Sequence, residues 1–359
     1  MIDKNIVLLF DDVQTKYGKL NFGNEHIDEL YTQIVYSKRD DPDPKIIPIF
    51  YTHREEEKYV NEWIADVINF FNRHKDFIEL TNNKIVVCDL LESNRTLAKS
   101  VEIVSNYVQK IIYVVTPNYK VISTNKVKFL HNPTFYKFLW PIKNTLKYKP
   151  KKLYINLNRA YRYHRALLID NLYEHNLLKC GYTTFGDAYN DINQYIEENP
   201  NSNLDKIKFD ILDEPDLKNV NPVYKYPAEC KKSFLFLNTE TWVDNDRLFL
   251  TEKSFKPAGI GMPFINLGNP GTLAKMRELG FYTFSPWIDE SYDLDLPLQQ
   301  RIDIVIENLK RLSQHTDKEL IKIRNQMNYR IQHNHRLYNI FYNKNFTNEN
   351  FQLIVNGAV

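Results

Sequence analysis

Three arginines and a histidine gather where a predicted strand gives way to a predicted helix. Residues 152–158, KLYINLN, form a short apolar run typical of a buried strand, and Arg159, Arg162, His164 and Arg165 follow it closely. Leucines spaced for a helix come next. Cations at the start of a helix oppose its dipole, so their presence favours a bound anion there. Nearby carboxylates that make the cations tolerable are the alternative.

A second charged group opens another predicted helix. Thr251 can cap that helix, Glu252 lies in its first turn, and Lys253 and Lys256 add cations beside it. Free backbone amides at a helix start attract phosphate, and a carboxylate beside them can accept hydrogen bonds from a pair of ribose hydroxyls. Taken alone, the Thr-Glu-Lys triplet fits a capped surface helix with solvated charges better.

The segments before and after this helix predict the strands and the helix that surround it. Apolar runs at 233–237 and 262–267 predict two buried strands on either side of it, and spaced apolar residues predict another helix that ends at Gly280. Residues 281–284 are predicted as a third strand. Strands and helices that alternate at this pitch indicate a parallel sheet wrapped by helices.

Residues 249–293 also carry a family resemblance. They read FLTEKSFKPAGIGMPFINLGNPGTLAKMRELGFYTFSPWIDESYD. This pattern resembles the donor-binding segment of α(1,3)-fucosyltransferase-like and exostosin-like glycosyltransferases of the GT-B fold. It is most similar to uncharacterised glycosyltransferases common in phages and large viruses. The resemblance is specific across these residues and thin elsewhere.

The resemblance implies roles for individual residues. Arg165 matches an arginine at a helix start that holds the donor diphosphate, and Arg162 and His164 are neighbours that can replace or assist it. Glu252 matches the glutamate that binds the ribose hydroxyls. Lys253 would neutralise the leaving diphosphate together with Arg165, and Lys256 would assist at the phosphates or pack against the strand. The implied mechanism uses no metal and no cofactor beyond the nucleotide-sugar co-substrate.

The first half of the chain predicts a second sheet of the same kind. Five short apolar runs predict strands, and two amphipathic segments, 57–71 and 93–108, predict helices between them. No G-x-G-x-x-G fingerprint indicates a dinucleotide. Ligands lie at the carboxyl ends of such strands, where Glu92 is a candidate general base for an acceptor hydroxyl. The alternative is that Glu92 starts or caps the helix that follows.

The pattern therefore predicts an α/β protein of the GT-B type, with two Rossmann-like domains facing a cleft. Residues 1–149 would form the acceptor-side domain, and 150–317 would form the domain that binds the nucleotide-sugar. Residues 318–359 would be a helical segment that crosses back to the first domain. The lysine- and proline-containing stretch before Pro150 is the predicted linker.

Composition narrows the classes of protein. The chain has 359 residues, 43% of them apolar, which suits a globular protein with two domains of ordinary size. No apolar run reaches the roughly 18 residues that span a bilayer, so no membrane span is expected. Three cysteines without metal-type spacing suit the reducing cytoplasm, or the host cytoplasm if the chain is viral.

The acceptor stays open between two kinds of hydroxyl. A glycan or other saccharide is the first, and a 5-hydroxymethylated pyrimidine of phage DNA is the second. A net charge of only +2 argues against a strong grip on nucleic acid and favours the glycan. A hypothesis from another class is a non-catalytic module that binds a nucleotide or a sugar.

Overall fold

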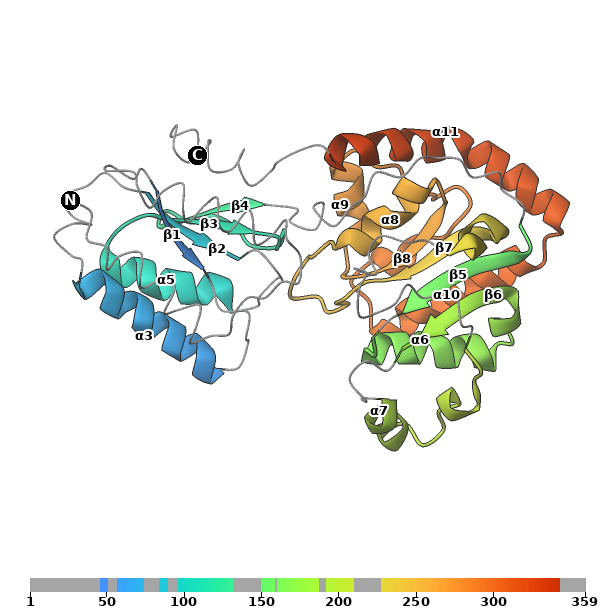
Figure 1. The fold of residues 1–359 in the computed structure, drawn as a ribbon, viewed down its shortest axis with the longest axis horizontal. Helices are drawn as coiled ribbons and strands as arrows, with labels where there is room; N and C mark the ends of the chain where they lie inside the picture. Colours follow the sequence, from blue (N-terminus) through green and yellow to red (C-terminus); the bar gives the residue numbers. More distant parts are fainter. Residues whose placement is uncertain are drawn as a thin grey trace. The chain divides into compact units, whose positions relative to one another are not determined.

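The computed structural model describes residues 46–50, 57–73, 84–89, 96–131, 150–158, 160–186, 192–209 and 227–342. The chain divides into two compact units, Met1–Thr134 with Asn345–Val359, and Phe135–Lys344. Each unit has a four-stranded parallel sheet with helices packed on it, which confirms the predicted α/β class (Figure 1). Residues 132–149, with the predicted linker, lie outside the described part, and the GT-B arrangement around a cleft stays a prediction.

The first unit is a parallel sheet with strand order β1-β2-β3-β4. Its described elements are β1 (Ile46–Phe50), α3 (Glu57–Arg73), β2 (Lys84–Cys88), α5 (Leu97–Val108), β3 (Ile112–Thr116) and β4 (Val127–His131). Both helices cover the same face of the sheet (Figure 1). Trp63 and Val67 of α3 and Val101 of α5 pack with Val87 and Val114 of the strands in one buried cluster. The amphipathic spacing read from the sequence thus decides which helix face is buried.

The second unit has strand order β6-β5-β7-β8, again entirely parallel. Its first half comprises β5 (Lys152–Asn158), α6 (Tyr163–Glu174), η2 (Leu178–Cys180), β6 (Gly181–Phe185), α7 (Ile192–Glu198) and η3 (Leu204–Lys206). Its second half comprises η4 (Ala228–Lys232), β7 (Ser233–Thr239), α8 (Glu252–Ile260), β8 (Phe264–Leu267), α9 (Thr272–Glu278), η5 (Ser291–Asp293), α10 (Leu298–Ser313) and α11 (Asp317–Tyr342).

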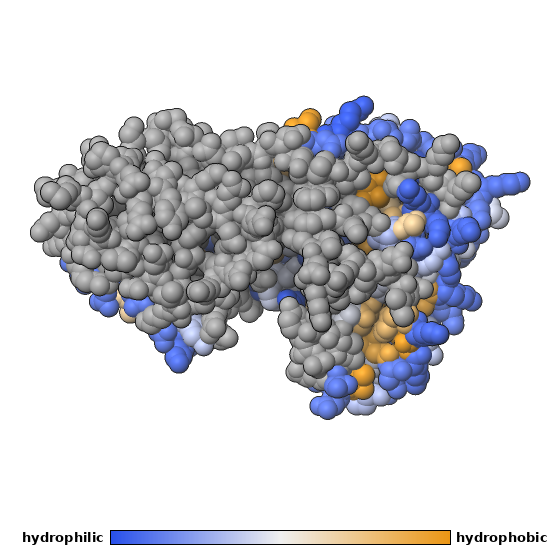
Figure 2. Space-filling model, in the orientation of Figure 1, coloured by the Kyte–Doolittle hydropathy of each residue, from blue (hydrophilic) through white to orange (hydrophobic). Residues whose placement is uncertain are grey.

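Helices cover both faces of this second sheet. Helices α6 and α10 pack together on one face, while α8 and α11 pack together on the other (Figure 1). Every residue of β7 is buried, as expected for a central strand of a parallel sheet covered on both sides. The outer side of α11, along the upper edge of Figure 2, is mostly hydrophilic.

The predicted third strand at residues 281–284 is wrong. These residues are not assigned to a strand, and none of the described strands pairs with them. The buried side chain of Asn334 on α11 takes the place of a strand, because Asn334 Oδ1 accepts from the Tyr282 backbone amide and Asn334 Nδ2 donates to the Tyr282 carbonyl, both at 2.8 Å. One amide side chain thus satisfies backbone groups that a sheet neighbour would otherwise bind.

The strand β6 was not predicted from the sequence. Its sequence, GYTTF, is short and only partly buried, so it lacks the apolar run that marked the other strands. The threonines and aromatic rings are nevertheless typical of an edge strand. The first residue of β6, Gly181, lies so close to the Tyr154 ring that a side chain at this position would collide with it.

The long C-terminal helix stays with the second unit. Helix α11 packs against α8 and β7, and Arg324 Nη2 donates to the Gly261 carbonyl at 2.7 Å. The segment predicted to return to the first domain was 318–359, and its residues 343–359 lie outside the described residues. None of the described helices is long and apolar enough to cross a membrane.

Candidate functional site

A group of polar and charged side chains of the second unit lies where its strand order reverses. The chain passes from β5 outward to β6 and then returns to the other side of β5 as β7. Loops leaving adjacent strands in opposite directions open a crevice at their carboxyl ends, which is where ligands bind in open α/β sheets. Helix α6 begins after β5 at this edge, and Glu240 and Thr241 follow β7.

The start of α6 is open. Arg162 is the N-cap residue, its backbone is extended, and no side chain caps the helix. The first turn contains no acidic residue. Within the described residues, the backbone amides of Tyr163 and His164 find no hydrogen-bond acceptor. Two amides and the positive end of a helix dipole are therefore available to an anion.

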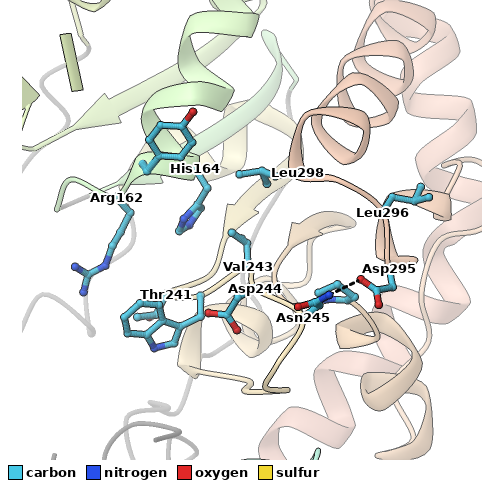
Figure 3. A pocket seen from close by; sticks show the side chains of 12 residues that line it. Arg162, His164, Thr241, Val243, Asp244, Asn245, Asp295, Leu296 and Leu298 are labelled. Carbon is cyan, nitrogen blue, oxygen red and sulfur yellow. Dashed lines mark hydrogen bonds between the residues drawn. The ribbon is translucent and has the colours of Figure 1, made fainter. Parts of the chain in front are cut away.

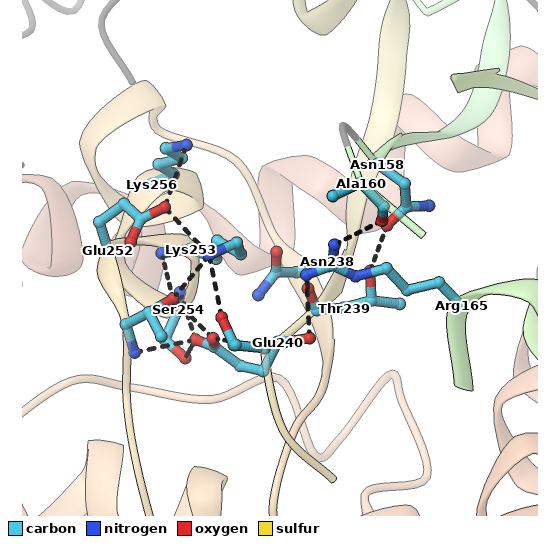
Figure 4. Close-up of polar contacts among 12 residues, drawn as sticks. Asn158, Ala160, Arg165, Asn238, Thr239, Glu240, Glu252, Lys253, Ser254 and Lys256 are labelled. Carbon is cyan, nitrogen blue, oxygen red and sulfur yellow. Dashed lines mark hydrogen bonds and ion pairs between the residues drawn. The ribbon is translucent and has the colours of Figure 1, made fainter. Parts of the chain in front are cut away.

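Arg165 lies beneath this helix start and is 5% exposed. Its guanidinium donates to the carbonyls of Ala160 at 2.9 Å and Glu240 at 3.2 Å, and Nε has no partner (Figure 4). No described carboxylate forms an ion pair with it. Burial, together with the charge of Arg162, lowers the pKa of Arg165 to about 10, so it stays charged at neutral pH. A buried cation without an anionic partner is costly, which favours a bound anion nearby.

Arg162 is the more accessible of the two arginines. It forms no hydrogen bond or ion pair with the described residues, and its Cζ lies 5.4 Å from the ring centroid of Trp242. The Cζ of Arg247 lies 4.1 Å from the centroid of the same ring. The Nε of Arg247 donates to both carboxylate oxygens of Asp244 at 3.0 Å. The two arginines therefore differ, because Arg247 is engaged by a carboxylate and Arg162 is left for a ligand.

His164 is neutral. Its Nε2 lies 2.9 Å from the Glu240 carbonyl oxygen and must donate to it, which leaves Nδ1 as an acceptor. Burial, and then the charge of Arg165, lowers the pKa of His164 to about 3. The expectation that His164 could assist at a diphosphate as a cation is therefore wrong, since protonation would place a third positive charge in a buried cluster.

The start of α8 is closed, unlike that of α6. Glu240 is fully buried, and its carboxylate accepts from the amides of Thr251 at 3.2 Å and Ser254 at 3.0 Å, and from the Thr251 and Ser254 hydroxyls. Thr251 caps the helix as predicted, accepting from the Lys253 amide at 3.1 Å. The expectation that these amides are free for phosphate is wrong, because Glu240 already supplies the anion.

The charged side chains of α8 form one cluster. Glu252 Oε1 lies 3.1 Å from Lys253 Nζ and 3.7 Å from Lys256 Nζ (Figure 4). Burial alone would raise the pKa of Glu252, but the two lysines outweigh it and hold the pKa at about 2. Lys253 Nζ also donates to the hydroxyls of Thr241 and Thr251, both at 3.3 Å. Glu252 is thus an ionised acceptor, and Lys253 is a partly exposed donor.

Glu240 and Thr241 join the two groups. The Glu240 carbonyl accepts from His164 and Arg165, and the Thr241 hydroxyl accepts from Lys253. The structure thus brings Arg162, Arg165 and the α8 cluster to the same end of one sheet. Glu92, the candidate general base, lies outside the described residues.

A pocket of 410 Å³ opens at the start of α6 (Figure 3). Its walls come from three segments and Pro270; the segments contribute Arg162–His164, Thr241–Asn245, and Asp295, Leu296 and Leu298. Arg301 holds the segment Thr241–Asn245 in place. Its Nη1 donates to the Val243 carbonyl at 3.1 Å, and its Nε donates to the Tyr292 carbonyl. The pocket is therefore a formed feature of the second unit.

The acidic residues near the end of the resembling segment hold the fold. Glu290 accepts from the Phe284 amide, Arg277 and Thr283, and Asp289 accepts from the Ser291 amide. The Tyr292 hydroxyl, which is buried, accepts from the Asn266 amide. Among the described residues, no three His, Cys, Asp or Glu side chains come together as a metal site would need.

Glu240 and Trp242 are the site residues that the sequence did not predict, because both lie between the predicted strand at 233–237 and the predicted helix that Thr251 caps. The one available signal was their position directly after a buried strand, at the edge where ligands bind. A search of family models and of curated protein sequences finds no match for this chain.

Proposed function

We propose that this protein is a glycosyltransferase that moves a sugar from a nucleotide-sugar donor to a hydroxyl group of a saccharide. The single observation that carries the proposal is the unpaired cationic cluster at the start of α6. Arg162 and Arg165 meet two open amides there, and no acidic residue of the first turn offsets their charge. Such a cluster suits a diphosphate.

The roles of the residues follow from their surroundings. Arg162 and the amides of Tyr163 and His164 contact the diphosphate, and Arg165 contributes its buried charge from beneath. Lys253 approaches from the α8 side, and Glu252, held ionised, accepts hydrogen bonds from the ribose hydroxyls. Lys256 keeps Glu252 in place.

In the proposed reaction, the acceptor hydroxyl oxygen forms a bond to the anomeric carbon of the donor sugar. The bond from that carbon to the diphosphate oxygen breaks, and the nucleoside diphosphate leaves with both electrons. The cations stabilise the charge that develops on the leaving oxygen. The hydroxyl proton passes to a general base, for which Glu92 is the candidate.

A thermal-shift screen with UDP, GDP, CDP, ADP and TDP sugars tests the proposal, because a ligand that binds only the folded state raises its melting temperature. We expect one nucleotide-sugar to stabilise the wild-type protein. We expect Arg162→Ala to weaken its binding about 10- to 100-fold, as for the loss of a charge-assisted hydrogen bond. Arg336→Ala, at an exposed position on α11, is the matched control and should bind like wild type.

Turnover is tested with the nucleotide-sugar found in that screen. Release of the nucleoside diphosphate should continue in excess chelator, since side-chain cations supply the charge. Activity that is lost with chelator and restored by Mn²⁺ or Mg²⁺ would contradict the metal-independent mechanism. If none of the nucleotide-sugars in the screen stabilises the protein, the proposed function itself is contradicted.

A further inference from the structure

The pocket beside α6 has one basic wall and one wall that repels anions. In Figure 3, Arg162 and His164 lie on one side, and Asn245 and Asp295 lie on another. Asn245 Nδ2 donates to Asp295 Oδ1 at 3.2 Å, and the Asp244 carboxylate is engaged by Arg247. A ligand that fills this pocket therefore carries its anionic group at the α6 end and uncharged polar groups elsewhere.

His164 adds a specific requirement to the basic wall. Its Nε2 donates to the Glu240 carbonyl, so Nδ1 carries a lone pair, and Nδ1 finds no donor within the described residues. The side chain is 5% exposed and lines the pocket. A ligand that fills the pocket displaces water from this acceptor and must therefore present a group that donates a hydrogen bond to it. A phosphate oxygen cannot supply one at neutral pH.

The position of His164 limits which ligand group can reach it. His164 is the second residue of α6, and its own amide is one of the two that remain open for an anion. The donor group must therefore lie only a few bonds from the phosphate. A hydroxyl of a sugar ring esterified to that phosphate meets this condition, whereas a nucleobase is separated from the phosphate by the ribose.

We propose that the pocket binds a sugar ring esterified to the phosphate at the start of α6, and that His164 Nδ1 accepts a hydrogen bond from one of its hydroxyls. This assignment rests on the anion site of the proposed function and adds a specificity-determining residue to it. The ring is either the ribose or the transferred sugar, and the two sources share the same chemistry.

Calorimetric titrations with three probes test the assignment: pyrophosphate, ribose 5-phosphate and glucose 1-phosphate. The informative variant is His164→Gln, because its amide nitrogen can still donate to the Glu240 carbonyl while its acceptor oxygen does not occupy the position of Nδ1. We expect this variant to bind pyrophosphate like wild type and to bind at least one sugar phosphate about tenfold more weakly. The sugar phosphate that is affected identifies the ring. His175→Gln, at the exposed C-terminal end of α6, should leave all three affinities unchanged.

Other outcomes would overturn the assignment. Equal affinities of wild type and His164→Gln for every sugar phosphate would do so, and so would a parallel loss of pyrophosphate binding, because His164 would then act on the anion. If His164→Leu weakens sugar-phosphate binding while His164→Gln does not, His164 acts through Glu240 alone. Sugar-phosphate binding that depends on His164, in a protein that binds no nucleotide-sugar, would contradict the proposed function and leave this assignment standing.

Discussion

At the scale of single residues, Glu240 is the side chain on which the site depends. Its carbonyl oxygen fixes the tautomer of His164 and binds Arg165, and its carboxylate closes the start of α8. A fully buried carboxylate is tolerated here because amides and hydroxyls of Thr251 and Ser254 surround it. Glu240 therefore connects the start of α6 to the start of α8.

Replacing Glu240 with glutamine should destabilise the protein. The amide removes one acceptor oxygen and turns a second donor toward the Thr251 or Ser254 hydroxyl, which should lower the free energy of unfolding by about 2 to 3 kcal/mol. Urea unfolding measures this loss. Glu278→Gln, at a side chain that is 66% exposed and paired only with Lys275, is the matched control and should stay within about 0.5 kcal/mol of wild type. A Glu240→Gln protein as stable as that control would contradict the capping role.

At the scale of elements, Asp293 holds the start of α9. Its carboxylate accepts from the amides of Leu273 and Ala274 at 3.0 and 3.1 Å. Burial nevertheless outweighs these bonds and raises the pKa of Asp293 from 3.8 to about 6. The folded protein therefore holds this proton more tightly than the unfolded chain does.

This shift predicts how stability depends on pH. The contribution of Asp293 is fully present below pH 3.8 and is lost as the pH rises through 6. Between pH 4 and pH 7.5, the free energy of unfolding of wild type should fall by about 2 kcal/mol relative to Asp293→Asn. Urea titrations at both pH values measure the difference. For Asp303→Asn, at an exposed position on α10, the free energy of unfolding should change with pH in parallel with that of wild type. If the wild-type and Asp293→Asn curves are parallel as well, the pKa of Asp293 is not raised.

Local patterns predicted most elements of the second unit because their causes are local. The strands 152–158 and 233–237 were marked by apolar runs, and α8 by its Thr251 cap. Residues 281–284 have the same apolar character, but Asn334, more than 50 residues away along the chain, decides that they do not form a strand. No local pattern contains that information.

In the candidate site, too, features with local causes could be predicted from the sequence and features with tertiary causes could not. Basic residues before α6 and charged residues in α8 were evident from their types and spacing. Which helix start stays open was not, because the answer depends on the Glu240 side chain, which reaches α8 from the end of β7. The neutral state of His164 likewise follows from burial and from Arg165, and both are consequences of tertiary packing.

At the scale of the whole molecule, the contacts that the basic residues make bear on whether the acceptor is a glycan or DNA. Helix α11 is rich in basic residues, which a groove for nucleic acid would need. In the structure, Arg324 donates to the Gly261 carbonyl, Arg330 to the Thr283 carbonyl, His333 to the Gly280 carbonyl and His335 to the Gly259 carbonyl. These side chains attach the helix to its own unit, which leaves fewer of them for phosphates.

We therefore expect weak binding to duplex DNA that contains 5-hydroxymethylated pyrimidines. With a net charge of +2 and these basic side chains engaged, the dissociation constant at physiological salt should be no tighter than the roughly 10⁻⁴ to 10⁻⁶ M of non-specific binding. Fluorescence anisotropy of a labelled duplex at about 50 and 200 mM salt measures both the affinity and its salt dependence. An unmodified duplex of the same sequence is the control, and the two should bind alike. Nanomolar affinity for the modified duplex alone, falling steeply with salt, would instead identify DNA as the acceptor, because a protein that neutralises many phosphates releases as many counterions.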